Sequence, residues 1–511
     1  MKRTIILVIL DGWGVGKPDD SNPVHVVNPQ NIAYLNANFP SGILQASGIS
    51  VGLPWSEEGN SEVGHLNLGA GRIIYQYLPR ITLAINDGSL FKNKALIGAF
   101  EHAQKNNSAV NFVGLLSEGN VHSSLEHLNA LIQFAKEQKI TKLNLHLFSD
   151  GRDSPPTSLL NLLTRISGEV NIASLSGRFY GMDREQYWDR TQKAYSVLIG
   201  DGEEIDSIEN HVKKNYERKF SDEFIEPVII NSEGAIKEND AIVFFNFRED
   251  RIRQMTSAFI NPQFDKFPVK SFKNLYVTTM TQYDKSFNVP VIFPPEKIDT
   301  CLSGVLSEKG KMQLKIAETQ KYPHITYFFN GAKEEPFKNE YRILIPSKAI
   351  VHQEKDPAMM AQEITTRLVQ SISEGVFDFI LVNYANSDIV AHTGDYNACL
   401  EAVRIIDKQI EILTQAVLAT NAVLIVTSDH GNIERVFDPL TGLPETKHDS
   451  NPVPIYLVAK EFQRQKSEVE AREAMKQNLG ILADVAPTIL ELMKIPQPKE
   501  MTGQSLLKFL I

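Results

Sequence analysis

Several features are scarce in this sequence of 511 residues, and each scarcity argues against a class of protein. The only two cysteines, Cys301 and Cys399, stand far apart and outside any C-x-x-C spacing, which indicates neither a disulfide framework nor a thiolate metal site. No apolar run approaches the roughly 18 residues that a membrane helix requires. The formal net charge of −10 gives no general attraction for nucleic acid or anionic membranes. We therefore expect a protein of the reducing cytoplasm that binds a small molecule rather than nucleic acid or membrane.

The chain starts with MKRTIILVIL, which has the basic and apolar regions of a signal peptide. The apolar run is short, however, and DGWG follows at once without a small-residue cleavage site. We interpret this segment as a buried strand. With 42% hydrophobic and 22% charged residues, the chain has the composition of a globular enzyme with two or three cores.

Short apolar strands alternate with polar turns and amphipathic helices, which is typical of an α/β fold. Near the two ends, nearly continuous apolar runs predict strands of a parallel sheet that is covered by helices on both faces. These runs are residues 4–10, 377–384, 422–427 and 455–459. The apolar spacing over residues 396–417 predicts a crossover helix.

The middle of the chain has strand candidates of its own, which predict a second α/β domain. They are residues 110–116, 142–148, 170–175, 241–247 and 274–280. Prolines near Pro79 and in the segment 288–297 suit linkers. We expect a discontinuous domain of residues 1–76 and 297–511, interrupted by an inserted domain of residues 77–296.

Three aspartates follow three predicted strands: Asp11, Asp388 and Asp429. Because ligands bind beyond the carboxyl ends of parallel strands, these carboxylates should converge. His392 lies four residues after Asp388, His430 follows Asp429, and His448 precedes the last strand. This oxygen and nitrogen set suits Mn²⁺ or Zn²⁺ better than Ca²⁺. An Asp-Gly turn and a solvated Asp-His pair are common too, so the pattern alone leaves metal binding and a structural role both open.

Polar residues also follow the predicted strands of the middle domain. They include five arginines in an otherwise acidic protein, and guanidinium groups match phosphate and carboxylate bidentately. The sequence therefore predicts a local pocket for an anionic metabolite, although a single arginine is more often solvated. The residues are His122, Arg152, Asp153, Arg178, Arg184, Arg248 and Arg251.

Ser61 lies between glycines in EEGNSEVGHLNLGAGR. The stretch lacks the G-x-S-x-G pattern of a nucleophile elbow, so taken alone it favours a loop serine. The remaining motifs change this interpretation.

GNSEVGH (59–65), LDGWG (10–14), DIVAHTGD (388–395), TSDHGN (427–432) and KHDSNPVP (447–454) together closely resemble the motifs of the cofactor-independent phosphoglycerate mutases. This family belongs to the alkaline phosphatase superfamily, and the resemblance runs from residue 4 to about residue 505. It implies an alkaline phosphatase-like parallel-sheet domain that binds metal and an inserted α/β domain that binds substrate. The implied activity is that of an isomerase, which interconverts 2- and 3-phosphoglycerate in glycolysis and gluconeogenesis.

The resemblance also implies roles for individual residues. Ser61 would be the catalytic serine that becomes phosphorylated, and two divalent ions, usually Mn²⁺, would be bound. One ion would have the ligands Asp388, His392 and His448, and the other Asp11, Ser61, Asp429 and His430. The substrate-binding set would be His122, Arg152, Asp153, Arg178, Arg184, Arg248 and Arg251, with Lys321 facing the phosphoserine from the other domain. Asp153 would be a candidate acid or base for the glycerate hydroxyls, and the protein is expected to be a monomer.

The sequence departs from the family pattern at REDR (248–251), where a proline commonly follows the first arginine. Glu249 therefore adds a negative charge beside the arginines. Two enzymatic alternatives stay open: a phosphopentomutase and a metal-dependent phosphomonoesterase of the same superfamily. The arginine-rich insertion argues against both. A non-catalytic metal- or phosphate-binding protein is a third alternative, but it would not need a serine between metal ligands.

Overall fold

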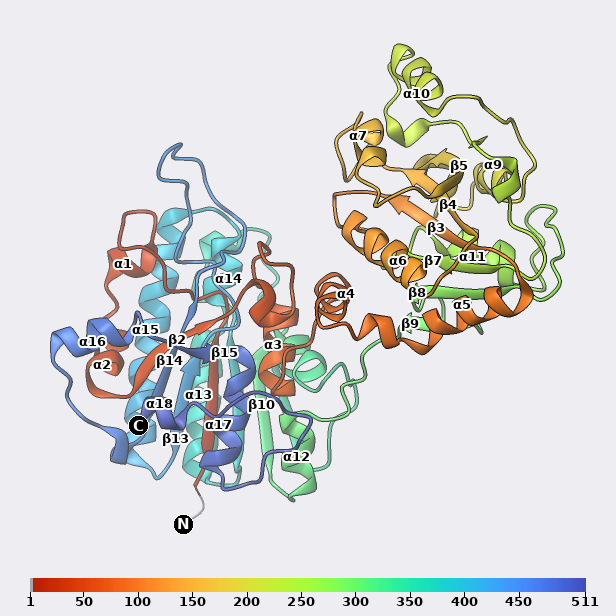
Figure 1. The fold of residues 1–511 in the computed structure, drawn as a ribbon. Helices are drawn as coiled ribbons and strands as arrows, with labels where there is room; N and C mark the ends of the chain where they lie inside the picture. The colour runs from red at the N-terminus through yellow and green to blue at the C-terminus, as the bar shows by residue number, and fades with distance from the viewer. Residues whose placement is uncertain (1–2) are drawn as a thin grey trace. The chain divides into compact units, whose positions relative to one another are not determined.

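The computed structural model describes residues 3–511, which form two compact units (Figure 1). One unit comprises Met1–Gln76 and Lys297–Ile511, and the other comprises Tyr77–Glu296. Each contains one sheet with helices on its faces, so the predicted α/β class is confirmed. Among the described residues, no helix is long and apolar enough to cross a membrane.

The discontinuous unit is built on an eight-stranded sheet with the order β11-β10-β12-β1-β13-β14-β2-β15. Its strands are β1 (Ile5–Leu10), β2 (Ser41–Gln45), β10 (Gln313–Glu318), β11 (Glu340–Ile345), β12 (Phe379–Tyr384), β13 (Val423–Thr427), β14 (Val453–Val458) and β15 (Asn478–Ile481). Strand β1 lies at the centre and pairs in parallel with β12 and β13.

Strand β14 is the exception in the predicted parallel sheet, because it runs antiparallel to both neighbours while the other strand pairs are parallel. Its apolar residues do predict a buried strand, but burial on both faces does not determine direction. A parallel return requires a long crossover, usually a helix. The connection over residues 428–452 contains no helix among the described residues, and the chain returns beside β13 in the opposite direction.

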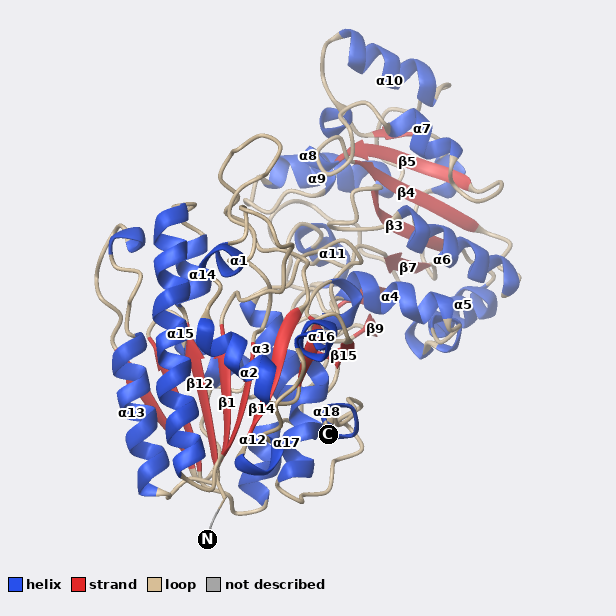
Figure 2. Ribbon diagram, turned by 90° about the vertical axis from the view of Figure 1, so that its left-hand side faces the viewer, coloured by secondary structure: helices blue, strands red, loops and turns tan. Residues whose placement is uncertain are grey.

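Helices cover both faces of this sheet, as Figure 2 shows. They are α1 (Pro23–Val27), α2 (Gln30–Asn38), α3 (Ser61–Ala70), α12 (Leu302–Glu308), α13 (Ala361–Glu374), α14 (Asn386–Ala391), α15 (Tyr396–Ala419), α16 (Glu468–Ala474), α17 (Val485–Leu492) and α18 (Leu507–Leu510). Helix α15 confirms the crossover helix predicted from apolar spacing.

The alternation of side chains along β1 divides the core of this unit into two layers. Ile6, Val8 and Leu10 pack in one cluster with residues of α13 and α15. Ile5 and Ile9 pack in the other with residues of α12 and α17. Because both faces are buried, β1 is apolar at every position, and polar residues begin only where the strand ends.

The inserted unit has a seven-stranded sheet with the order β6-β5-β4-β3-β7-β8-β9. Its strands are β3 (Val110–Leu116), β4 (Leu143–Ser149), β5 (Asn171–Gly177), β6 (Val228–Ile229), β7 (Ala241–Phe244), β8 (Tyr276–Thr281) and β9 (Val291–Phe293). Only β6 is antiparallel to its neighbour. The helices are α4 (Tyr77–Asn86), α5 (Lys94–Asn106), α6 (Leu125–Glu137), α7 (Leu159–Thr164), α8 (Arg178–Gly181), α9 (Trp188–Leu198), α10 (Ile208–Glu217) and α11 (Arg253–Ile260).

Candidate active site

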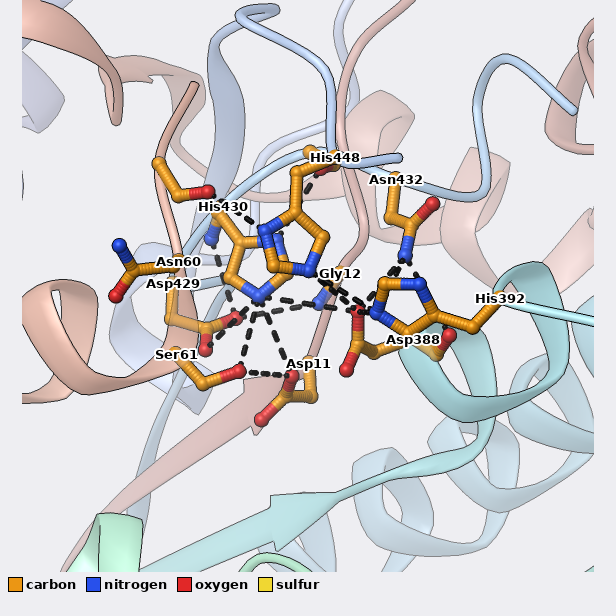
Figure 3. Close-up of polar contacts among 12 residues, drawn as sticks. Asp11, Gly12, Asn60, Ser61, Asp388, His392, Asp429, His430, Asn432 and His448 are labelled. Carbon is orange, nitrogen blue, oxygen red and sulfur yellow. Dashed lines mark hydrogen bonds and ion pairs between the residues drawn. The ribbon is translucent and has the colours of Figure 1, made fainter. Parts of the chain in front are cut away.

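The structure brings the predicted metal-ligand residues together at the carboxyl edge of the eight-stranded sheet (Figure 3). Asp11 directly follows β1, Asp429 follows β13 after one residue, and Asp388 lies in α14 just beyond β12. Ser61 is the first residue of α3, whose N-cap is Asn60. Parallel strands end at the same edge, so residues far apart in the sequence become neighbours here.

The turn after β1 needs a glycine for two independent reasons. Gly12 has φ +68°, in the left-handed region that side chains disfavour. A Cβ atom at this position would lie 2.8 Å from both the Cα and the Cβ of Asp388. The backbone N–H of Gly12 donates to Asp429 Oδ1 at 3.2 Å. The Asp-Gly turn thus allows three ligand-bearing segments to approach closely.

Asp388, His392 and His448 form the first cluster of potential ligands. The Nδ1 atom of His392 lies 2.8 Å from the carbonyl of Thr446, and that of His448 lies 2.8 Å from the carbonyl of Gly59. A carbonyl only accepts, so each Nδ1 donates a proton, and in its neutral form each ring presents an Nε2 lone pair. The two Nε2 atoms are 3.1 Å apart, and both lie within 3.3 Å of Asp388 Oδ1.

Three electron-pair donors thus converge in the first cluster, which is the arrangement that a cation satisfies. Ligands held at about 2.0–2.2 Å from a divalent ion lie about 3.0–3.6 Å from one another. The separations among Asp388, His392 and His448 fall in this range. The residues therefore fit a metal ion both in chemistry and in spacing.

Ser61 lies in the second cluster, with Asp11, Asp429 and His430. Its Oγ donates to Asp11 Oδ1 at 3.1 Å and lies 3.0 Å from His430 Nε2. The same Nε2 is 3.5 Å from Asp11 Oδ1 and 3.6 Å from Asp429 Oδ2. All four side chains are buried, so any charge that develops here is shielded from bulk water.

Lys321 connects the two clusters. It lies between β10 and the π-helix η5 (His324–Phe328), three residues before that helix, and its side chain is buried. Its ammonium donates to Asp11 Oδ1 at 2.7 Å, Ser61 Oγ at 2.8 Å and Asp388 Oδ2 at 2.6 Å. Burial alone would lower the pKa of Lys321, but Asp11 and Asp388 raise it above its usual value. Lys321 therefore stays protonated next to the serine.

The carboxylates of this site also remain ionised despite their burial. Burial would raise the pKa of Asp388, but the charge of Lys321 holds it well below its usual range. Burial would also raise the pKa of Asp429, but His430 and His65 lower it below its usual value. His430 shows the reciprocal effect, because Asp429 and Asp11 raise its pKa to about 10 against the effect of burial. Three carboxylates thus face two cations, the Lys321 ammonium and the protonated His430, which leaves a net negative charge in the site.

Two supporting residues were missed by the sequence analysis: His65 and Asn383. The Asn383 amide donates to Asp11 Oδ2 at 2.7 Å and to His65 Nε2 at 3.0 Å. His65 Nδ1 must then carry the proton, which it directs at the Ser61 carbonyl and at Asp429 Oδ2. Although His65 lies within a potential ligand group with Asp11 and Asp429, this tautomer makes it a support for them. A signal existed for Asn383, the one amide in the apolar run FILVNY.

In the inserted unit, the predicted substrate residues also lie beyond the carboxyl ends of strands. His122 follows β3, Arg152 and Asp153 follow β4, and Arg178 and Arg184 follow β5. Arg248 and Arg251 follow β7. Arg178 is buried and donates to Asp150 Oδ1 and Asp153 Oδ2, both at 2.6 Å.

Asp150, which the sequence analysis did not single out, organises the turn after β4. Its carboxylate accepts bonds from the backbone N–H groups of Arg152, Asp153 and Ser154 and from the Ser117 hydroxyl. Burial would raise the pKa of Asp150, but these donors and Arg178 lower it. Asp150 thus fixes the backbone that carries two predicted substrate residues.

Asp250 is the second acid that the sequence analysis missed here. It pairs with Arg184 at 2.7 Å and Arg248 at 3.2 Å, and it lies 3.5 Å from His122 Nδ1. The negative charge among the arginines therefore comes from Asp250, whereas the sequence had drawn attention to Glu249. Burial, followed by the charges of Arg184, Arg178 and Arg152, lowers the pKa of Arg251. The arginines thus share one local field of excess positive charge.

Comparisons with known proteins agree with this geometry. A family model described as the N-terminus of the BPG-independent phosphoglycerate mutases matches residues 81–285. The 2,3-bisphosphoglycerate-independent phosphoglycerate mutase of Clostridium botulinum is 43% identical, over 99% of this chain and 100% of its own length. That of Francisella tularensis is 42% identical over the full length of both chains. The chain belongs to this family.

A solved structure of a phosphoglycerate mutase resembles this chain over its full length. The phosphoglycerate mutase of Leishmania mexicana, crystallised at low cobalt concentration, is 28% identical in sequence. It superposes with a TM-score of 0.52 and covers 99% of this chain and 97% of its own. The likeness therefore extends over both units and is not confined to the motifs around Ser61.

Proposed function

We propose that this member of the mutase family is an isomerase that interconverts 2- and 3-phosphoglycerate through a phosphoserine on Ser61. The observation that carries the proposal is the position of Ser61 Oγ. It lies within hydrogen-bond distance of Asp11, His430 and Lys321, and Asp11 belongs to two groups of side chains that could hold a metal ion. The full-length relatives carry the name of this activity.

Two divalent ions, which we propose to be Mn²⁺, would be held by the two clusters. Asp388, His392 and His448 would bind one ion, and Asp11, Ser61, Asp429 and His430 the other. When bound, such ions lower the pKa of a coordinated hydroxyl and polarise a phosphoryl group. The mixed carboxylate and imidazole donors suit a borderline ion such as manganese.

The residues of the chain would then divide the work of phosphoryl transfer. Ser61 is the nucleophile, and Lys321 donates to its oxygen, which stabilises negative charge on the alkoxide and later on the phosphoserine. Ser61 is also the first residue of the ten-residue helix α3, and the positive end of a helix dipole stabilises a phosphate there.

We propose that the inserted unit retains the glycerate while Ser61 carries the phosphoryl group. Arg152, Arg178, Arg184, Arg248 and Arg251 would bind its anionic groups, assisted by His122. Asp153 would exchange protons with the glycerate hydroxyls. Its carboxylate accepts from Arg178 and is partly exposed, so a hydroxyl can reach it. Retention distinguishes a mutase from a phosphatase, because lost glycerate would leave the phosphoserine to water.

The cellular setting is a further part of the proposal. We expect a cytoplasmic monomer of glycolysis and gluconeogenesis that binds neither nucleic acid nor membrane. Both cysteines are buried and unpaired, as suits a reducing compartment.

One assay tests the activity. The purified chain, with added Mn²⁺, is given 3-phosphoglycerate, and the formation of 2-phosphoglycerate and of free phosphate is followed together. A mutase forms 2-phosphoglycerate with little free phosphate. Release of phosphate as the main product would instead indicate a phosphomonoesterase, and no turnover of either kind would indicate a binding protein.

A further inference from the structure

Glu434 is a buried acid near the metal-ligand clusters whose function no motif suggests. It lies in the loop after β13, four residues beyond His430, and only 1% of its surface is exposed. Its Oε2 atom accepts from the backbone N–H groups of Gly14 at 2.9 Å and Asn432 at 2.8 Å. One carboxylate oxygen thus joins the loop that follows β1 to the loop that follows β13.

The backbone around Glu434 is shaped to admit its carboxylate. A Cβ atom at Gly14 would lie 2.1 Å from Glu434 Oε1, and one at Gly431 would lie 2.2 Å from the same oxygen. Neither glycine has a positive φ, so the close approach of Glu434, rather than the backbone conformation, accounts for the absence of a side chain at both positions.

Asn432 extends this connection to a third loop. While its backbone N–H is held by Glu434, its side-chain amide donates to Asp388 Oδ1 at 2.8 Å. This is the oxygen that faces the Nε2 atoms of His392 and His448. The neighbouring N–H of Ile433 donates to the carbonyl of Gly12 at 3.0 Å. Residues 432–434 thereby join the segments that carry Asp11, Asp388 and Asp429.

From these contacts we infer that Glu434 is a positioning residue for the metal centre, acting through Asn432 on Asp388. The inference rests on the proposed function, since it assumes that Asp388, His392 and His448 bind an ion. Glu434 touches none of these side chains itself. Removing such outer contacts typically weakens metal binding by about 10- to 100-fold.

Two substitutions separate hydrogen bonding from charge. Glu434→Gln can place its amide oxygen where Oε2 lies and so accept both backbone N–H groups. Burial raises the pKa of Glu434 to about 7, so a neutral side chain is already compatible with the loop near neutral pH. Glu434→Met has a similar length but no acceptor, and it leaves the two buried N–H groups without a partner.

The experiment measures manganese binding by the metal-stripped, full-length chain, using the electron paramagnetic resonance signal of free Mn²⁺. We expect Glu434→Gln to bind within about threefold of the parent and Glu434→Met to bind one ion about 10- to 100-fold more weakly. Asn432→Ala should weaken the binding of the same ion. The double variant Glu434→Met with Asn432→Ala should bind that ion no more weakly than the weaker-binding single variant. Asn432→Ala also keeps the test decisive if Glu434→Met fails to fold.

Asp407→Ala is the matched control. Asp407 is also buried and also accepts two remote backbone N–H groups, from Asn31 and Ile32. Its loss should lower stability but leave manganese affinity at the parental value. Parental affinity in folded Glu434→Met or in Asn432→Ala would overturn the inference, as would an equal loss in Glu434→Gln and Glu434→Met. Failure of the proposed function would appear separately, as a parent chain that does not bind manganese.

Discussion

Each unit of the molecule contains a buried cation that holds two carboxylates, and the two arrangements differ in what surrounds them. Lys321 pairs with Asp11 and Asp388, and Arg178 pairs with Asp150 and Asp153, all at 2.6–2.7 Å. Around Lys321, the carboxylates face imidazole Nε2 atoms and the serine hydroxyl. Around Arg178, Asp150 is satisfied by backbone N–H groups and a hydroxyl.

The difference gives the two sites opposite local charge. Near Lys321, three carboxylates outnumber two cations, the Lys321 ammonium and the protonated His430, and the Nε2 atoms of His392 and His448 face Asp388. In the inserted unit, five arginines outnumber the four acids paired with them, Asp150, Asp153, Glu223 and Asp250. The same motif, a buried cation between two acids, therefore accompanies a demand for cations in one unit and for anions in the other.

Replacing Ser61 should have the largest effect, because it removes the reacting atom while keeping the charges of both units. We expect Ser61→Ala to lose mutase activity by more than about 10⁴-fold and to form no phosphoserine. Product assays and intact-protein mass spectrometry after exposure to substrate check this. Circular dichroism of the variant should match that of the parent, since alanine fits where serine did. Turnover near the parental rate would refute the mechanism.

Removing metal should affect the discontinuous unit, which carries the metal-ligand clusters, and leave the arginines of the inserted unit unchanged. A chelator should abolish activity and lower the melting temperature, since bound ligand at 100 times its dissociation constant stabilises a fold by about 2.7 kcal/mol. Added Mn²⁺ should restore both. Calorimetry with and without chelator provides the measurement.

The acid limb of activity serves as the control for metal removal. Protons compete with metal for His392, His430 and His448, and because the pKa of His430 is raised to about 10, activity at limiting Mn²⁺ should begin to fall above the usual titration range of histidine. Excess Mn²⁺ should move the midpoint to lower pH. Substrate phosphate also titrates near pH 6, but its protonation should respond far less to manganese at saturating substrate. If the pH midpoint of activity did not change with manganese concentration, this would count against metal binding by the histidines.

Arg251→Ala tests the role of the arginines in the inserted unit. Loss of one charge-assisted hydrogen bond to an anionic group costs about 1.5–3 kcal/mol, so we expect KM to rise by about 10- to 100-fold. Arg248→Ala should act in the same direction. Steady-state kinetics and elemental analysis of the same preparations test both variants. Metal content should stay parental, and loss of both metals would show that these arginines belong to the other site.

The smallest expected effect concerns His146, a buried histidine whose hydrogen-bond partners are neutral side chains. Burial lowers the pKa of His146 to about 3, and its ring contacts Ser174 and Asn111. Below pH 6.5 the unfolded chain takes up a proton that the folded chain refuses, so this stability contribution is lost as pH falls from 6.5 towards 3. His146→Gln should make unfolding less acid-dependent, by about 1.4 kcal/mol per pH unit. Urea unfolding at pH 5.5 and 4.5 measures the difference, and an equal pH dependence of parent and variant would contradict it.

The sequence by itself predicted the strands and the candidate reactive residues. Continuous apolar runs such as residues 4–10 predict strands buried on both faces, because water is excluded from both sides of the sheet. Polar side chains then appear where those runs stop, as at Asp11 and Asp429. This local pattern, together with the motifs around Ser61 and His448, predicted the class of fold and the family.

Only the tertiary structure decided which groups meet and in what state. The direction of β14 depends on the path of residues 428–452 rather than on its own apolar residues. The tautomer of His65 depends on Asn383, 318 residues away in the chain. Glu434 resembles an ordinary loop acid in the sequence, and only the fold brings it into hydrogen-bond contact with Gly14. Hydrogen bonds and charges act over a few ångströms in space, and sequence spacing does not encode that distance when the partners come from different strands.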